Sequence, residues 1–130
     1  MVGIVVVSHS RKIAEGIVEM ARQMSRPEQA LIAAGGMEDG GIGTDAMRVQ
    51  AAVSQADSGD GVVIMVDLGS AVLSAETALE FLPEELQKRV RIADAPVLEG
   101  SIAATVEASL GSDLSKVVQT AEDARNLKKC

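Results

Sequence analysis

Ile4-Val5-Val6-Val7-Ser8-His9-Ser10 is the stretch around which the fold of this chain is built. A run of consecutive β-branched aliphatic residues is typical of a strand buried on both faces. A helical pattern begins directly after Ser10, so the only histidine of the chain lies where a strand passes into a helix. In an open parallel sheet this is the carboxyl end of a strand, where ligands bind. A capping loop with an incidental surface histidine is the alternative interpretation.

The composition favours a single domain with an aliphatic core. The 130 residues are 47% hydrophobic, and Phe81 is the only aromatic residue. The lack of aromatic side chains argues against binding of bases or sugars by stacking. The formal net charge of -7 disfavours nucleic acid and anionic membrane as partners but is compatible with a basic protein.

Neither the cysteine content nor the hydropathy pattern indicates secretion. Cys130 is the only cysteine, so an internal disulfide is impossible and a reducing cytoplasm is the expected compartment. No apolar run is long enough to cross a bilayer, and we expect no targeting segment before the first strand. The expected location is therefore the cytoplasm.

Strand and helix patterns alternate along the whole chain. The predicted strands are residues 4–7, 29–34, 62–66 and 90–93. The predicted helices are residues 11–25, a segment capped by Thr44 or Asp45, a segment that Gly69-Ser70-Ala71 opens and that runs through Phe81, a short turn at 84–89, a segment with Ile102, Val106 and Leu110, and residues 113–127. Residues 35–43 are glycine-rich and 95–100 are predicted to be a loop.

This alternation predicts an α/β fold in which one domain, residues 1–130, has an open parallel sheet of about four strands with helices on both faces. The first and third strands are the most apolar, so we expect them in the middle and a strand order of 2-1-3-4. The switch point then lies between the first and third strands. His9 and Asp67 follow these two strands and should face each other there.

Apolar residues at helical spacing predict which faces are buried. Ile13, Ile17, Met20 and Met24 recur at steps of four, three and four, as expected for one apolar face of a helix. The simplest interpretation of Met20, Met24, Met47 and Met65 is that they fill the core.

The predicted switch point collects groups suited to phosphoryl transfer. A carboxylate beside an imidazole accepts from one ring nitrogen and leaves the other free as a nucleophile or base. The N-terminus of the helix that Gly69 and Ser70 open binds anions without a basic side chain. Small hydroxyls are near by topology, on Ser8, Ser10, Thr44 and Ser70. We therefore predict His9 and Asp67 as catalytic residues and, as phosphate-binding residues, Ser10, Thr44, Gly69 and Ser70.

Other roles remain open for each part of this arrangement. Asp67 could cap the turn that follows its strand, Ser70 could be a helix N-cap, and the glycine-rich segment could be a slack loop. That segment lacks the Gly-Lys-Ser/Thr ending of a P-loop, and it has no dinucleotide-binding register. One histidine and one distant cysteine form no metal-ligand cluster, so we expect no metal.

Four segments resemble the mannose-type EIIA family of the phosphoenolpyruvate phosphotransferase system (PTS), and within it the branch of DhaM subunits of bacterial dihydroxyacetone kinases. These segments are Val7-Ser8-His9-Ser10, Gly41-Ile42-Gly43-Thr44-Asp45, Asp67-Leu68-Gly69-Ser70-Ala71 with the helix that follows, and Ala95-Pro96-Val97-Leu98-Glu99-Gly100. They occur in the family's order and span most of the chain.

The resemblance implies a homodimer in which the carrier protein HPr phosphorylates His9 and Asp67 orients the ring. In DhaM systems the phosphoryl group passes from the phosphohistidine to ADP on the DhaL subunit, which phosphorylates dihydroxyacetone together with DhaK. No cofactor is then expected on this chain itself. Sugar-transporting members of the family pass phosphate to an EIIB domain and often have an exchanged C-terminal strand. The helical pattern of residues 113–127 favours the DhaM branch, and sugar transport is the alternative function.

Two further classes fit less well. A receiver-like domain phosphorylated on Asp67 needs acidic residues after the first strand to hold Mg²⁺, and here that place is Ser8-His9-Ser10. A hydrolase with a phosphohistidine intermediate would need an arginine cluster around the phosphate, for which only Arg11 and Arg48 are candidates.

Overall fold

A single parallel sheet forms the centre of the computed structural model, which describes residues 1–130. Its strands are β1 (Gly3–Ser8), β2 (Leu31–Gly35), β3 (Val62–Val66) and β4 (Val90–Ile92). They are all parallel in the order β2-β1-β3-β4, so the predicted fold class and strand order are confirmed.

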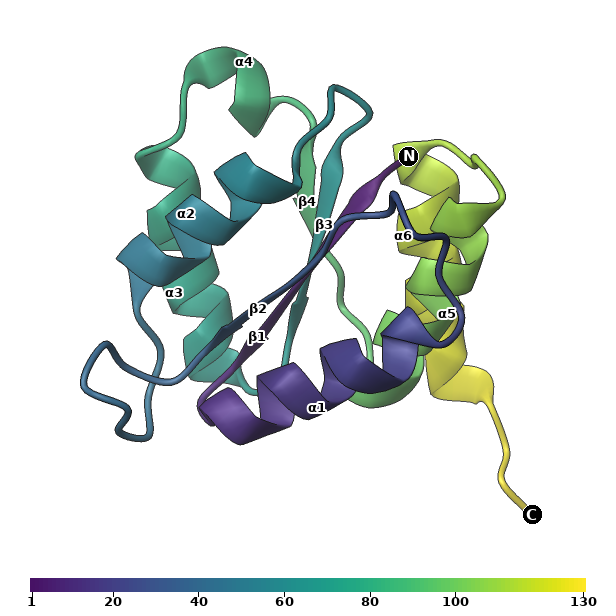
Figure 1. The fold of residues 1–130 in the computed structure, drawn as a ribbon, viewed down its shortest axis with the longest axis horizontal. Coiled ribbons are helices and arrows are strands. Elements are labelled where there is room, and N and C mark those ends of the chain that lie inside the picture. Colours follow the sequence, from purple (N-terminus) through teal and green to yellow (C-terminus); the bar gives the residue numbers. More distant parts are fainter.

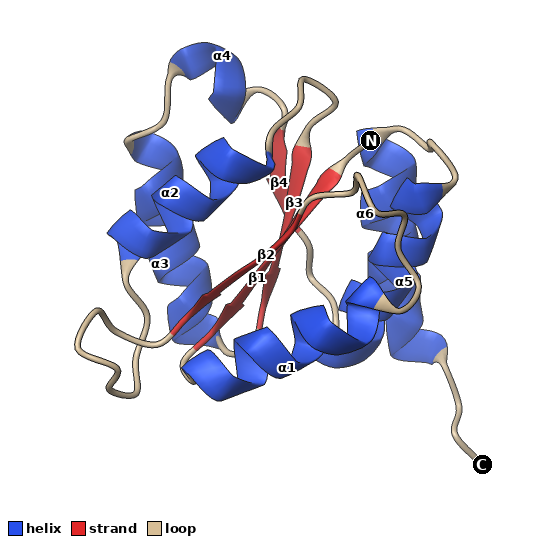
Figure 2. Cartoon of the chain, in the orientation of Figure 1, coloured by secondary structure: helices blue, strands red, loops and turns tan.

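Helices cover both faces of this sheet (Figures 1 and 2). Helices α2 and α3 pack on one face, and α1, α5 and α6 pack on the other. The bounds are α1 (Arg11–Arg22), α2 (Ala46–Ala56), α3 (Gly69–Glu80), α4 (Glu84–Gln87), α5 (Val97–Ser109) and α6 (Leu114–Asp123), with a 3-10 helix at Ala124–Asn126. No helix has the length and apolar character needed to span a membrane.

The two central strands supply the core of both layers. All residues of β1 and β3 are buried, which explains why their sequences lack the alternation of a half-exposed strand. Val5 and Ile64 point into the layer under α2 and α3, whereas Val6 and Met65 point into the layer under α1, α5 and α6. Burial on both sides fixes the register of these strands and hence the position of the residues that follow them.

The predicted apolar face of α1 is wrong in three of its four residues. Ile17 is buried, but Ile13, Met20 and Met24 are 52–54% exposed. The residues that accompany Ile17 at the sheet are Ala14 and Ala21. Methyl groups allow the helix to lie close to strands whose branched side chains already fill the space, and the larger side chains are displaced to the flanks.

Alanines also form the side that packs against the sheet on helix α3. The buried residues of α3 are Ala71, Ala75 and Ala78. Met65 is part of the core as expected, but Met47 on α2 is 62% exposed. The prediction that the methionines fill the core therefore holds for only one of the four.

The predicted loop at residues 95–100 is also wrong, because α5 begins at Val97 with Pro96 as its N-cap. Gly100 lies inside the helix, where an added Cβ would be 2.8 Å from Met65 Cε. A glycine that reads as a loop signal in the sequence is therefore a point of close helix–sheet packing. The expected apolar positions Val106 and Leu110 lie on the exposed side of α5, and Leu127 is 62% exposed after α6.

Substitution of Gly35 by alanine is expected to lower the free energy of unfolding by about 1–3 kcal/mol, because there is no space for a methyl group. A Cβ at Gly35 would lie 2.7 Å from Ser10 O and 2.8 Å from Arg11 Cα, both backbone atoms. Urea unfolding measures the effect. Gly16→Ala is the matched control, because a Cβ there meets nothing within 4 Å and alanine favours the helix by about 0.5–1 kcal/mol. Equal stability of both variants would contradict the packing argument.

Candidate functional site

The site lies at the carboxyl edge of the sheet, where β1 and β3 end side by side. Val7 pairs with Val66 in register, and Asp67 N donates to Val7 O at 3.2 Å. Ser8 and Asp67 follow this last pair, and His9 comes directly after Ser8. His9 and Asp67 meet as predicted from the strand order, with side chains 22% and 13% exposed.

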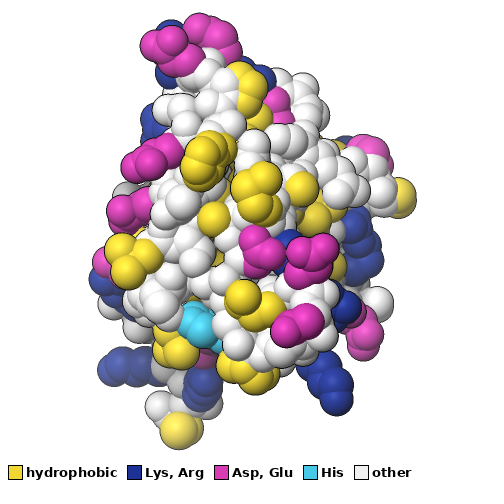
Figure 3. Space-filling view, turned by 90° about the vertical axis from the view of Figure 1, so that its left-hand side faces the viewer, with side chains coloured by type: hydrophobic (Ala, Val, Ile, Leu, Met, Phe, Trp, Pro, Cys, Tyr) yellow, Lys and Arg dark blue, Asp and Glu magenta, His cyan; other side chains and the backbone are white.

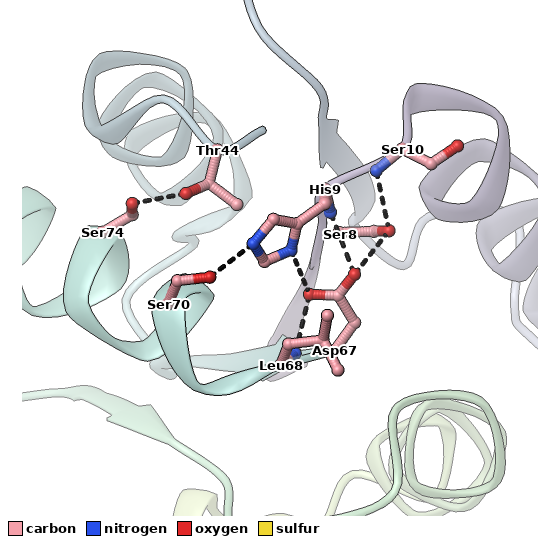
Figure 4. A network of polar contacts seen from close by, with 8 residues as sticks. All are labelled: Ser8, His9, Ser10, Thr44, Asp67, Leu68, Ser70 and Ser74. Carbon is pink, nitrogen blue, oxygen red and sulfur yellow. Dashed lines mark hydrogen bonds and ion pairs between the residues drawn. The ribbon is translucent and has the colours of Figure 1, made fainter. Parts of the chain in front are cut away.

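His9 is held by its Nδ1 atom. This nitrogen lies 2.9 Å from Asp67 Oδ1 (Figure 4). A carboxylate has no hydrogen to donate, so the hydrogen of this bond is on Nδ1 and the lone pair of the neutral ring is on Nε2. The contact therefore fixes both the orientation of the ring and the nitrogen that can act as a nucleophile.

The Asp67 carboxylate is itself fixed by three further donors. His9 N and Ser8 Oγ each donate to Oδ2 at 2.9 Å, and Leu68 N donates to Oδ1 at 2.7 Å. Burial tends to raise the pKa of Asp67, but the hydrogen bonds from the His9 amide, the His9 ring and the Ser8 hydroxyl outweigh it and lower the pKa. Asp67 therefore remains a carboxylate at neutral pH, and it both caps the turn at Leu68 and orients the ring.

Ser70 lies at the other nitrogen of the ring. Its Oγ is 2.5 Å from His9 Nε2, so the hydroxyl donates to the lone pair of the predicted nucleophile (Figure 4). The alternative role as an N-cap is not observed, because Leu68 occupies that position and α3 has no side-chain cap. The amides of Gly69 and Ser70 have no backbone acceptor and are available to an anion at this helix end.

The glycine-rich loop is attached to the site at two points. Gly43 N donates to His9 O at 2.9 Å, and Thr44 Oγ1 lies 2.5 Å from Ser74 Oγ on α3. Thr44 therefore lies near the ring, but its hydroxyl is engaged with Ser74, which was not among the predicted site residues. Phosphate binding by Thr44 stays a prediction. The spacing of four between Ser70 and Ser74, on one side of α3, is the signal that could have identified Ser74.

Ser10 takes a different place. Its hydroxyl accepts from Ile13 N at 3.3 Å as the N-cap of α1 and points away from the ring (Figure 4). Ser8 Oγ accepts from Ser10 N at 3.1 Å in addition to its contact with Asp67, and the sequence did not predict either contact. Phosphate binding by Ser10 stays a prediction.

Apolar side chains lie on the same edge of the sheet as the histidine. Five of them follow the carboxyl ends of the strands and are 52–79% exposed: Ile13, Ile42, Met47, Leu68 and Leu73. Figure 3 shows His9 at the surface with hydrophobic side chains beside it. A cavity of about 520 Å³ adjoins Asp67 and Gly69 and extends to Asp94 and Glu76. Exposed apolar surface around a reactive group is typical of a site that meets another protein.

The fold and this arrangement define the class: a parallel α/β domain that presents a histidine, oriented by a carboxylate, at the switch point of its sheet. The chain belongs to the mannose-type EIIA family, because the model of that family, described as the PTS system fructose IIA component, matches residues 3–118.

Two curated relatives agree with this assignment. The chain is 46% identical over 132 residues to the PEP-dependent dihydroxyacetone kinase phosphoryl donor subunit DhaM of Escherichia coli K12, with 99% of this chain and 28% of that protein covered. It is 40% identical to a DhaM subunit of Listeria innocua, with 92% of this chain and 95% of that protein covered. The chain therefore spans about a quarter of the first protein and nearly all of the second.

Solved structures show the same fold. One, described as a protein of unknown function, superposes with a TM-score of 0.83 at 40% identity and covers 95% of both chains. An EIIA component of the phosphotransferase system from Streptococcus agalactiae superposes with a TM-score of 0.69 at 12% identity and covers 99% of this chain and 97% of that one. The second likeness supports the fold alone.

Proposed function

We propose that this chain is a phosphohistidine carrier, which accepts a phosphoryl group from HPr on His9 and passes it to ADP bound on the DhaL subunit of a dihydroxyacetone kinase. The observation that carries the proposal is the state of the His9 ring, whose Nδ1 is bound to Asp67 while Nε2 keeps its lone pair and contacts only the Ser70 hydroxyl. Relatives that are named as phosphoryl donor subunits of PEP-dependent dihydroxyacetone kinases support this choice of kinase.

In the first step, Nε2 of His9 attacks the phosphorus of the donor's phosphohistidine. A new N–P bond forms on His9, and the N–P bond of the donor breaks with its electron pair returning to the donor's ring. The hydrogen on Nδ1 stays against Asp67, whose negative charge stabilises the positive charge that develops on the ring. In the second step, a β-phosphate oxygen of ADP attacks the same phosphorus, and ATP forms as the His9 N–P bond breaks.

Ser70 and the start of α3 have complementary roles in this cycle. The Ser70 hydroxyl must leave Nε2 before the attack, and it can then rotate to donate to a phosphoryl oxygen. The unpaired amides of Gly69 and Ser70 face an anion with the positive end of the helix dipole behind them. The site can therefore hold a phosphoryl group although no arginine side chain contacts His9.

The proposal includes protein partners on both sides of the transfer. HPr and DhaL would bind in turn to the exposed apolar side chains around His9, because both must reach the same histidine. DhaK would act with DhaL on the substrate. An acidic chain of net charge -7 suits basic partners. A homodimer and a cytoplasmic location are also part of the proposal, and the sheet edge beyond β4 is open to a second copy.

Transfer to a sugar EIIB is the second candidate function, because the family model that matches residues 3–118 is described as the PTS system fructose IIA component. The C-terminal region favours the first candidate, since residues 114–123 form a helix and the sheet has no fifth strand.

The acceptor is tested by mixing the phosphorylated protein with ADP-loaded DhaL and, separately, with a sugar EIIB. We expect ATP to form on DhaL and the label to leave His9, because this chain has no nucleotide motif of its own and the nucleotide must be brought to it. ADP without DhaL is the control, and it should leave the label in place. Transfer to EIIB with no ATP on DhaL would assign the chain to sugar transport.

A further inference from the structure

Ser8 is buried beneath the site and takes no direct part in the proposed transfer. It is the last residue of β1, and its side chain is completely inaccessible to solvent. Polar side chains are rarely buried without a partner, because the loss of water must be offset by hydrogen bonds. The partners of Ser8 therefore indicate why a hydroxyl is present at this position.

The hydroxyl of Ser8 links the backbone amide of Ser10 to the carboxylate of Asp67. Its oxygen accepts from Ser10 N at 3.1 Å, and its hydrogen is directed to Asp67 Oδ2 at 2.9 Å. Because a carboxylate can only accept, the hydroxyl acts toward Asp67 as a donor. A charge-assisted hydrogen bond of this kind is stronger than one between neutral groups.

The Ser8 donor matters because the two oxygens of the carboxylate contact different groups. Oδ1 contacts the His9 ring and accepts from Leu68 N, whereas Oδ2 is held by the Ser8 hydroxyl and by His9 N. Rotation about the last side-chain bond of Asp67 would move both oxygens together. Loss of the Ser8 donor would leave Oδ2 with one bond from the protein and the plane of the carboxylate less strictly fixed against the ring.

We propose that Ser8 is a positioning residue for the His9–Asp67 pair: its hydroxyl holds Oδ2 so that Oδ1 stays aligned with Nδ1 of the ring. Ser8 touches neither the phosphoryl group nor the reactive nitrogen, and it acts through Asp67. The effect on the transfer rate rests on the proposed function, whereas the effect on the pair can be measured in the protein without any partner.

The test compares Ser8→Ala with Ser101→Ala and Ser8→Thr. Ser101 is the matched control, since it is also fully buried and its hydroxyl oxygen has no hydrogen-bond partner. Carbon NMR of the Asp67 carboxyl and nitrogen NMR of the His9 ring report the pair directly. In Ser8→Ala we expect the pKa of Asp67 to rise and the ring to populate both tautomers. We expect the transfer rate to fall about tenfold, by analogy with the partners that orient metal-bound histidines.

Ser8→Thr retains the hydroxyl and is expected to restore the parent values in all three measurements, and Ser101→Ala is expected to match the parent. A drop in the melting temperature of Ser8→Ala alone, with Asp67 titration and ring tautomer unchanged, would overturn the proposal and leave Ser8 a packing residue. If Ser8→Ala shifts both NMR signals but the parent protein accepts no phosphoryl group, the positioning role stands and the proposed function fails. If Ser8→Thr does not fold, Ser8→Cys, a weaker donor, replaces it and should give intermediate values.

Discussion

Replacement of His9 by alanine is expected to reduce phosphorylation by phosphoenolpyruvate, enzyme I and HPr to the background of the assay. His9 is the only histidine of the chain, and its Nε2 is the ring nitrogen left free by the bond between Nδ1 and Asp67. Alanine removes the nucleophile and leaves nothing in its place. The ring is partly exposed and outside both apolar clusters, so the variant should remain folded.

Transfer of radiolabel from phosphoenolpyruvate, followed on a denaturing gel, measures this effect. Far-UV circular dichroism and the melting temperature check the fold of His9→Ala. The label on the parent protein should be lost in acid and persist in alkali, as expected for a bond between nitrogen and phosphorus. Label that survives the substitution would remove His9 from the mechanism, and acid-stable label on the parent would point to another residue.

Asp67→Asn is expected to fold and yet to transfer the phosphoryl group about 100-fold more slowly, or slower still, by analogy with other histidine–carboxylate pairs. The carboxylate accepts four hydrogen bonds, from Ser8 Oγ, His9 N, Leu68 N and the His9 ring. An asparagine has one oxygen for these donors. Its NH₂ group must therefore take the place of either Oδ1, beside the ring, or Oδ2, beside Ser8 Oγ and His9 N. If the NH₂ group takes the place of Oδ1, it donates to Nδ1 of the ring. The ring hydrogen then moves to Nε2, which has no lone pair left for the attack.

Single-turnover transfer from phosphorylated HPr measures the rate, and nitrogen NMR of the His9 ring measures the tautomer. Asp94→Asn is the matched control, because Asp94 borders the same cavity and its side chain is 92% exposed. This control removes one negative charge near the site without touching the ring. An Asp67→Asn protein that transfers at the rate of Asp94→Asn would show that the carboxylate has no role in orienting His9.

Much of the site could be predicted because it depends on strand order. The apolar content of residues 4–7 and 62–66 placed these two strands in the centre, and adjacent central strands bring the residues that follow them together. The meeting of His9 and Asp67 follows from this topology without any knowledge of side-chain packing. Because α3 begins at Gly69, two residues after Asp67, the start of that helix lies at this edge of the sheet as well.

The burial of the helices could not be predicted in the same way. A spacing of three and four residues is satisfied on α1 both by Ile13, Ile17 and Met20 and by Ala14, Ile17 and Ala21. Hydrophobicity favours the first set, but the distance between helix and sheet selects the second. That distance is set by the volume of the valine and isoleucine side chains in the strands, which act together only in the folded protein.

The sequence by itself determined the fold class, the strand order and the histidine–carboxylate pair, because each depends on the pattern of apolar residues and on where the strands end. Only the tertiary structure decided which atoms meet. It placed the Ser70 hydroxyl on Nε2 instead of on the end of α3, turned the Ser10 hydroxyl toward α1, and put Ser8 behind Asp67. The physical reason is that a hydroxyl has several donors and acceptors within reach along its own chain, and the choice among them is made by neighbours that arrive from other strands and helices.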